Sequence, residues 1–127
     1  MKKLLLILIC LFVSFEVKSQ IKDGDIYSCI TTNVIGMKGH KVVTFDTFKF
    51  NVFVNSERLV LIMGDEEKEF KNKVFFKSNM SHFSRSMGIN QIILRSKLDG
   101  TKIVDLYETM VGPDGGSIMS GKCVLEE

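Results

Sequence analysis

Residues able to carry out chemistry are few in this sequence and lie far apart. The chain of 127 residues has two histidines, His40 in "IGMKGH" and His82 in "MSHFSRSM". A Ser–His–Asp triad needs a nucleophile beside such a base, and the sequence has no GxSxG nucleophile motif. A three-histidine zinc site needs one histidine more than the chain has. We therefore predict a protein that is not an enzyme and that holds no metal or other cofactor.

One segment combines side chains that suit copper. Met80, His82 and Met87 would offer Cu(I) two thioethers and an imidazole. Their spacing matches no metal-binding motif that we recognise, and four further methionines are scattered between positions 37 and 119. The simpler interpretation is a protein that uses methionine as a flexible filler of its core or barrel lining.

The first nineteen residues have the build of a secretory signal peptide. Two lysines precede an apolar run over residues 4–15, and small or β-branched residues stand just before Gln20. The apolar run is shorter than the about 20 residues that a membrane-spanning helix needs. We predict cleavage of residues 1–19, a single β domain over residues 20–127, no membrane span, and a periplasmic or secreted location.

The net charge of the mature chain argues against nucleic-acid binding. The leader takes away three of the 17 basic and one of the 15 acidic residues, which leaves 14 of each. A neutral domain lacks the basic surface that a nucleic-acid partner requires. The remaining 108 residues are enough for one domain with one modest core, and we expect a monomer.

Two cysteines remain after the leader is removed, Cys29 and Cys123. An even number of cysteines in an exported protein predicts a disulfide. A metal or redox pair is the alternative, but the chain has no CxxC motif and no histidine near either cysteine. The bond would close a loop across 94 positions, for which the chain-entropy model gives an upper figure of about 4 to 5 kcal/mol.

Alternating apolar and polar residues predict strands along nearly the whole mature chain. In "TFKFNVFVN", for example, Phe50, Val52 and Val54 share one face. Short polar turns separate the alternating runs, and Asp99-Gly100 is a strong hairpin signal. The expected strands cover residues 25–32, 48–54, 58–63, 68–77, 90–97, 102–111 and 116–124, with weaker candidates at 41–45 and 81–86.

Two hairpins follow from this pattern. Residues 48–54 should pair with 58–63, and 90–97 with 102–111. The second strand of the latter hairpin is apolar on both faces, so either Val104 and Leu106 or the Ile103 and Tyr107 face turns inward. The predicted core consists of Phe48, Phe50, Val52, Leu59, Leu61, Ile92, Leu94, Val104 and Leu106.

These strands predict an all-β fold, a small antiparallel β-barrel of seven to eight strands that is lipocalin-like or similar. A β-sandwich is the alternative. In a closed barrel the first strand pairs with the last, so a bond between Cys29 and Cys123 would fasten the seam. An immunoglobulin-like sandwich usually buries a tryptophan against its disulfide, and this chain has none.

The layout of the chain resembles that of small exported bacterial β-barrels that inhibit lysozyme. Those proteins carry an early YxC motif and a cysteine near the end, and here Tyr27, Ser28 and Cys29 form the motif while Cys123 is the later cysteine. The resemblance implies inhibition of a cell-wall enzyme. The serine- and glycine-containing loop that such inhibitors insert into the enzyme is not matched, because "SNMSHFSRSMG" has a different order of residues.

Two kinds of binding protein therefore remain. We expect a noncatalytic barrel that holds a small apolar ligand in its mouth, since eight strands are about the size at which a barrel is either filled or leaves room for one ligand. The alternative is a protein-binding module, or an inhibitor of an enzyme such as lysozyme. Its loop contacts would use exposed side chains such as His82, Arg85 and His40.

Overall fold

The computed structural model describes residues 20–85, 89–97, 101–112 and 115–126, and these segments form an all-β protein. Ten strands are present: β1 (Asp25–Lys38), β2 (Lys41–Thr44), β3 (Lys49–Val54), β4 (Leu59–Met63), β5 (Glu66–Phe70), β6 (Asn72–Lys77), β7 (Met80–Arg85), β8 (Asn90–Ser96), β9 (Ile103–Gly112) and β10 (Gly115–Leu125). Within the described segments, no helix has the length and apolar character needed to cross a membrane.

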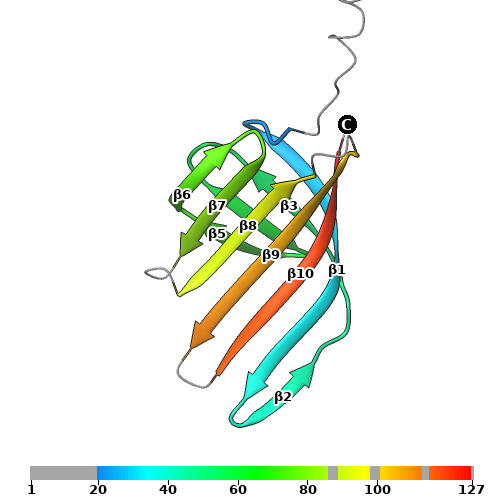
Figure 1. Ribbon diagram of the computed structural model, residues 1–127, viewed down its shortest axis with the longest axis vertical. Helices are drawn as coiled ribbons and strands as arrows, with labels where there is room; N and C mark the ends of the chain where they lie inside the picture. Colours follow the sequence, from blue (N-terminus) through cyan, green and yellow to red (C-terminus); the bar gives the residue numbers. More distant parts are fainter. Residues whose placement is uncertain (1–19, 86–88, 98–100, 113–114, 127) are drawn as a thin grey trace, which may run out of the picture.

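The strands form one antiparallel sheet that curls into a nearly closed barrel of nine strands (Figure 1). Their order is β5-β4-β3-β1-β10-β9-β8-β7-β6, and β2 pairs with β1 outside this series. The predicted barrel is confirmed, with more strands than the expected seven or eight. The predicted strand 68–77 is in fact two strands, β5 and β6, which are the two edge strands of the sheet. The chain leaves β5, which pairs with β4, at Lys71 and continues as β6, which pairs with β7.

Both predicted hairpins are confirmed by the register. Val52 lies opposite Leu61 in the pair β3–β4, and Leu94 lies opposite Leu106 in the pair β8–β9. The connection at Asp99-Gly100 lies outside the described residues. Val104 and Leu106 face the interior, so the ambiguity of β9 is settled in their favour.

The barrel interior is filled by apolar side chains from every wall. Eight of the nine predicted core residues are buried, and Phe48 is the exception, with 36% of its surface exposed. Its backbone N–H donates to Thr31 Oγ1 at 2.8 Å just before β3 begins, so the ring lies at the rim. The buried apolar cluster comprises Ile21, Tyr27, Cys29, Phe50, Val52, Val54, Leu59, Leu61, Phe70, Phe83, Ile92, Leu94, Val104, Leu106, Met119 and Cys123.

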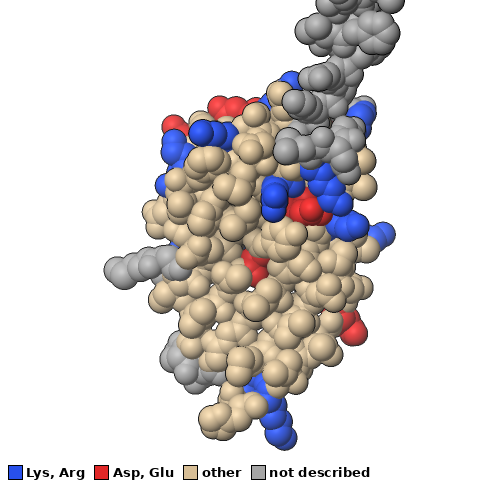
Figure 2. Space-filling view, viewed as in Figure 1, with Lys and Arg blue, Asp and Glu red and all other residues tan. Residues whose placement is uncertain are grey.

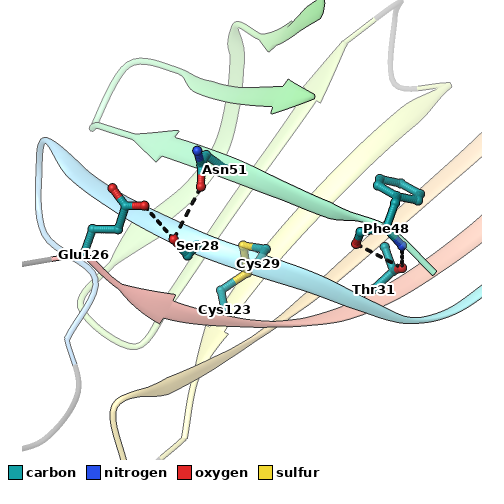
Figure 3. The surroundings of a disulfide bond; sticks show 7 residues. All are labelled: Ser28, Cys29, Thr31, Phe48, Asn51, Cys123 and Glu126. Atoms are coloured by element: carbon teal, nitrogen blue, oxygen red, sulfur yellow. Dashed lines mark hydrogen bonds between the residues drawn. A yellow bond between two sulfur atoms is a disulfide. The ribbon is translucent and has the colours of Figure 1, made fainter. Parts of the chain in front are cut away.

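The predicted disulfide joins Cys29 of β1 to Cys123 of β10 (Figure 3). The two cysteines are directly opposite one another in the antiparallel pair, and their Cα atoms are 4.0 Å apart. The C-terminal end of β10 is fixed further, because the Ser28 hydroxyl donates to the Glu126 carboxylate and the Glu126 N–H donates to the Ile26 carbonyl. The bond therefore fastens the first strand of the domain to the last, as the sequence predicts.

The barrel ends at Thr31, but β1, β9 and β10 continue beyond it. A bulge between Thr31 and Asn33 interrupts the β1–β10 register, and Gly121 lies opposite. A Cβ on Gly121 would stand 2.8 Å from the Ile30 carbonyl oxygen, so this close crossing requires glycine. We call the projecting sheet the arm; it consists of residues 33–38 of β1, all of β2, 109–112 of β9 and 115–120 of β10, and forms the lower part of Figure 1.

Candidate binding groove on the arm

An apolar groove of about 530 Å³ lies on the face of the arm that continues the barrel interior. Phe45, Val43 and Met110 supply apolar side chains, and Lys38 is its charged member. The complete lining is Gly36, Met37, Lys38, Val43, Phe45, Met110, Gly112, Gly115, Gly116 and Ser117. The volume falls within the range of small-molecule sites, roughly 300 to 1,000 Å³.

Glycine explains why this part of the sheet is hollow. Gly36 has no side chain to stand between β1 and the Phe45 ring, and a Cβ there would come within 2.7 Å of that ring. Phe45 is held in place by its N–H, which donates to the Val34 carbonyl at 2.9 Å. Gly115 has a φ of 137°, and a Cβ on it would stand 2.1 Å from the Met37 carbonyl oxygen. Larger residues at these positions would fill the groove or force its strands apart.

A polar cluster lies between the groove and the apolar barrel core. Lys68 reaches from β5 to Glu108 on β9, with Nζ 2.5 Å from Oε1. Asn90 Nδ2 donates to the same Glu108 oxygen at 3.1 Å and to the Thr109 carbonyl at 2.9 Å. Asn90 lies opposite Met110 in the β8–β9 register, so the cluster adjoins the inner end of the groove.

The cluster is built to be held inside the protein. The Glu108 side chain is 11% exposed and that of Lys68 is 22% exposed, so each charge needs the other to offset its desolvation. Asn90 Oδ1 is buried without a hydrogen-bond partner. Both Nδ2 protons of Asn90 already have acceptors, namely Glu108 Oε1 and the Thr109 carbonyl. If the amide were turned over, its oxygen would face these two acceptors, so the amide is correctly oriented as it stands.

A second polar group lies at the opposite end of the barrel. Tyr27 is buried, and its hydroxyl donates to Asp25 Oδ2 at 3.2 Å. Burial raises the pKa of Tyr27 above its ordinary value, and the neighbouring Asp25 charge and hydrogen bond raise it further. Tyr27 therefore stays neutral and has a structural role.

The structure does not bring together the three residues predicted to make loop contacts. His40 lies in the turn between β1 and β2, whereas His82 and Arg85 lie on β7, which β8, β9 and β10 separate from β1. His82 Nε2 is 2.8 Å from Gln91 Oε1. The two β7 residues are three positions apart and point to opposite faces of the sheet. Their contact role remains a prediction.

The described part of the chain assembles no cluster of metal-binding side chains. Within residues 20–85, 89–97, 101–112 and 115–126, no three His, Cys, Asp or Glu side chains lie close enough together to hold a metal ion. Of the copper candidates, Met80 and His82 lie on β7, and Met87 falls outside the described residues.

Sequence reasoning missed the groove. The segments "VIGMKGH" and "GPDGG" were interpretable only as a strand end and a turn. Their glycines were the available signal, since glycine within a strand marks close approach or missing side-chain volume. What alternation could not show is that Met37 of β1 and Gly115 of β10 lie side by side in the arm, so close that a Cβ on Gly115 would stand 2.1 Å from the Met37 carbonyl oxygen.

No family model matches the chain, and no curated protein matches it. Its function must therefore be argued from the groove, the barrel and the disulfide.

Proposed function

We propose that the protein is a noncatalytic, exported binding protein that holds a small apolar ligand in the groove of the arm. The observation that supports this best is the groove itself, an apolar hollow of about 530 Å³ with a single charged side chain, Lys38, in its lining. Such concave apolar sites bind ligands by removing apolar surface from water.

The packing of the barrel favours the arm over the barrel interior as the ligand site. Val52, Leu59, Phe70, Phe83 and Ile92 all have no exposed surface, and they come from opposite walls. A ligand inside the barrel would have to displace these side chains, which costs several kcal/mol for a close-packed core. A ligand in the groove displaces only water.

The disulfide supports export. Cys29 and Cys123 are bonded, and disulfides persist in oxidising compartments such as the bacterial periplasm and the extracellular space. Together with the lysine-containing apolar leader, this supports a periplasmic or secreted location and removal of residues 1–19. Intact mass measurement of the exported protein tests the cleavage site, because a product beginning elsewhere than at Gln20 would contradict it.

A groove-filling variant tests the ligand site. Ser117 lines the groove on β10, so Ser117→Trp should occupy the ligand volume. Thr109→Trp on β9 is the matched control, because Thr109 is exposed and its neighbour Met110 is the residue of β9 that faces the groove. Binding of 1-anilinonaphthalene-8-sulfonate and its displacement by dodecanol, dodecanoate or dodecane would be followed by fluorescence. We expect at least tenfold weaker binding for Ser117→Trp and little change for Thr109→Trp; equal affinity in both variants would refute the groove site.

A second candidate is inhibition of a cell-wall enzyme such as lysozyme. The observation that favours it is the disulfide-fastened seam, which realises the YxC and C-terminal cysteine layout as a barrel. Lysozyme activity against bacterial cells would be measured with increasing amounts of the protein. If inhibition is seen, replacing His82, Arg85 and His40 by alanine should weaken it, and an unchanged lysozyme rate would exclude this enzyme as the target.

A further inference from the structure

The outer face of the arm, opposite the groove, is apolar and exposed. Its apolar side chains are from 41% to 69% exposed and belong to Ile35, Met37, Val42, Val111 and Ile118. The register makes them neighbours, since Val42 lies opposite Met37 and Ile35 lies opposite Ile118. Exposed apolar residues are common singly, but a contiguous group marks an interaction surface.

Apolar side chains therefore cover both faces of one projecting element. Phe45, Val43 and Met110 line the groove on the inner face, and Val42, Ile118 and Val111 lie on the outer face. A sheet normally buries at least one face against another layer of the protein, whereas the arm extends beyond the opposite wall of the barrel. A partner that covers only one side would leave the other in water.

The tip of the arm is basic. Lys38 and Lys41 lie directly opposite one another where β1 turns into β2, both are exposed, and neither makes an ion pair within the described residues. The described arm contains no Asp or Glu. The sequence adds Asp114 in the connection at 113–114, outside the described residues, so two lysines accompany one carboxylate. In Figure 2, charges gather at the upper end, while the lower part is nearly free of them except at its basic tip and one acidic group at the margin.

We propose that the arm docks on an anionic lipid bilayer, with its tip inserted among the headgroups. A fluid lipid surface can cover both faces of an inserted element at once, which a flat protein surface cannot do. Lysines at the tip would remain at headgroup level, where each contributes about 1 kcal/mol of attraction to anionic lipid. The apolar side chains behind them would enter the boundary between headgroups and acyl chains.

Backbone hydrogen bonding limits the depth of this insertion. Among the described strands β2 pairs only with β1, so its other side presents unpaired N–H and C=O groups. Unpaired backbone groups are excluded from the hydrocarbon interior but tolerated in the hydrated headgroup region. The arm is therefore suited to contact one leaflet, as a peripheral protein does.

Vesicle binding tests the proposal directly. The purified protein would be sedimented with vesicles of phosphatidylcholine alone and with vesicles of a two-to-one mixture of phosphatidylcholine and phosphatidylglycerol. We expect binding to the anionic vesicles at least tenfold tighter than to the neutral ones, and weaker as salt rises. Equal or absent binding to both kinds of vesicle would overturn the proposal.

Paired variants locate the contact. Ile118→Asp places a charge on the outer face of the arm, and Val124→Asp makes the same change on the same strand and face at the level of the barrel, at a residue that is also exposed. We expect at least a tenfold loss of vesicle binding for Ile118→Asp and no loss for Val124→Asp. Both sites are exposed, so the fold should survive, and circular dichroism would verify it. Equal binding by the two variants would show that the arm is not the contact.

Two double variants that remove the same charge distinguish attraction by the lysines of the tip from attraction by the overall charge of the protein. Lys38→Gln with Lys41→Gln should weaken binding to anionic vesicles by on the order of thirtyfold, the effect of two lysines at about 1 kcal/mol each. Lys22→Gln with Lys49→Gln removes the same charge from exposed positions on the barrel and should change binding far less. The reverse order of effects would contradict docking by the tip.

A fluorescent reporter and the state of association complete the test. The chain has no tryptophan, so Val42→Trp would carry a single one, and its emission should shift to the blue with anionic vesicles and stay unchanged in Val124→Trp. A lipid-free dimer that Ile118→Asp dissociates would instead assign the outer face to a second copy of the chain and overturn the proposal. The ligand site is tested separately, because Ser117→Trp fills the groove on the inner face, whereas Ile118→Asp changes only the outer face.

Discussion

The barrel and the arm share their long strands, but the inner faces of the two regions have very different surroundings. In the barrel, Tyr27, Cys29 and Thr31 of β1 point inward and are at most 4% exposed. In the arm, Phe45 lines the inner face and is 55% exposed. Strand β9 shows the same contrast on a single face, because Leu106 has no exposed surface and Met110, four residues further on, is 42% exposed. One strand thus passes from a closed core to an open sheet without a change in its secondary structure.

The difference begins where β1 changes its neighbouring strand. In the barrel β1 pairs with β3, whose ladder ends where Lys49 lies opposite Ile30, and beyond that point β2 takes the place of β3. Thr31 marks this border, because its N–H donates to the Phe48 carbonyl. Its hydroxyl also accepts from the Phe48 N–H, as Figure 3 shows. Burial of the inner face therefore depends on how far the barrel wall continues alongside each strand.

The largest effect is expected from removal of the disulfide. Replacing Cys29 and Cys123 by alanine should lower the free energy of unfolding by several kcal/mol, with about 4 to 5 kcal/mol as the upper figure for this loop. Urea unfolding measures the loss. Barrel amides that exchange by global unfolding should lose protection, whereas arm amides that exchange by local opening should change little. Equal changes in both regions would show that barrel and arm unfold as one unit.

A matched pair of phenylalanines compares the two regions directly. Phe83→Ala empties a fully buried position in the barrel and should cost about 3 to 5 kcal/mol. Phe45→Ala removes the same side chain from the arm, where Phe45 is 55% exposed, and should cost about 1 kcal/mol or less. Chemical unfolding of both variants gives the two values. A loss in Phe45→Ala as large as that in Phe83→Ala would mean that the arm has a core of its own.

The polar cluster at the border should give an intermediate effect. Glu108→Leu leaves Lys68 without its carboxylate inside the protein, and we expect a loss of about 2 kcal/mol, below the range for fully buried pairs because Lys68 is partly exposed. The double variant Lys68→Met with Glu108→Leu removes both charges and should recover most of that loss. Thermal unfolding of the single and double variants decides the matter. A double variant less stable than Glu108→Leu would contradict an ion pair whose main cost is desolvation.

The smallest effect is expected for Tyr27, whose ionisation changes the free energy of unfolding only at alkaline pH. Its pKa is raised in the folded protein, so the unfolded chain loses this proton first as the pH rises above the ordinary value of 10.0. Fewer protons bound in the unfolded state mean that the free energy of unfolding falls with increasing pH. The fall should be smaller in Tyr27→Phe, which has no phenol proton to lose. Urea unfolding on both sides of this pH tests it, and identical slopes for the two proteins would exclude a Tyr27 contribution.

Alternation predicted the barrel well because the barrel walls alternate. Val52 and Leu61 were placed in the core from the pattern of their strands, and they face each other there. The same rule failed for Phe48. The apolar alternation begins there, one residue before β3 starts at Lys49, and this position lies at the rim of the barrel. The β9 faces could not be distinguished, since Ile103 and Tyr107 are as apolar as Val104 and Leu106.

The arm was beyond the reach of the pattern. Alternation continues along β9 with no sign of where the barrel ends, and Met110 follows Leu106 on the same face with the sequence appearance of a core residue. The exposure of Met110 is set by how far the rest of the barrel wall extends, and that wall belongs to distant parts of the chain. The disulfide, by contrast, was predictable from the number of cysteines and the expected compartment, without knowledge of the sheet.

The place of β10 in the sheet governs the order in which the protein can fold. This last strand lies between β1 and β9, so the meander from β1 to β5 and the meander from β6 to β9 share a continuous ladder only through it. Each meander is made of local hairpins that can form early, but their union must wait for contacts such as that between Cys29 and Cys123, 94 residues apart. Closing so long a loop is entropically costly and slows folding. A chain truncated before residue 115 would thus contain two separate meanders, in which β1 and β9 each lack the pairing with β10.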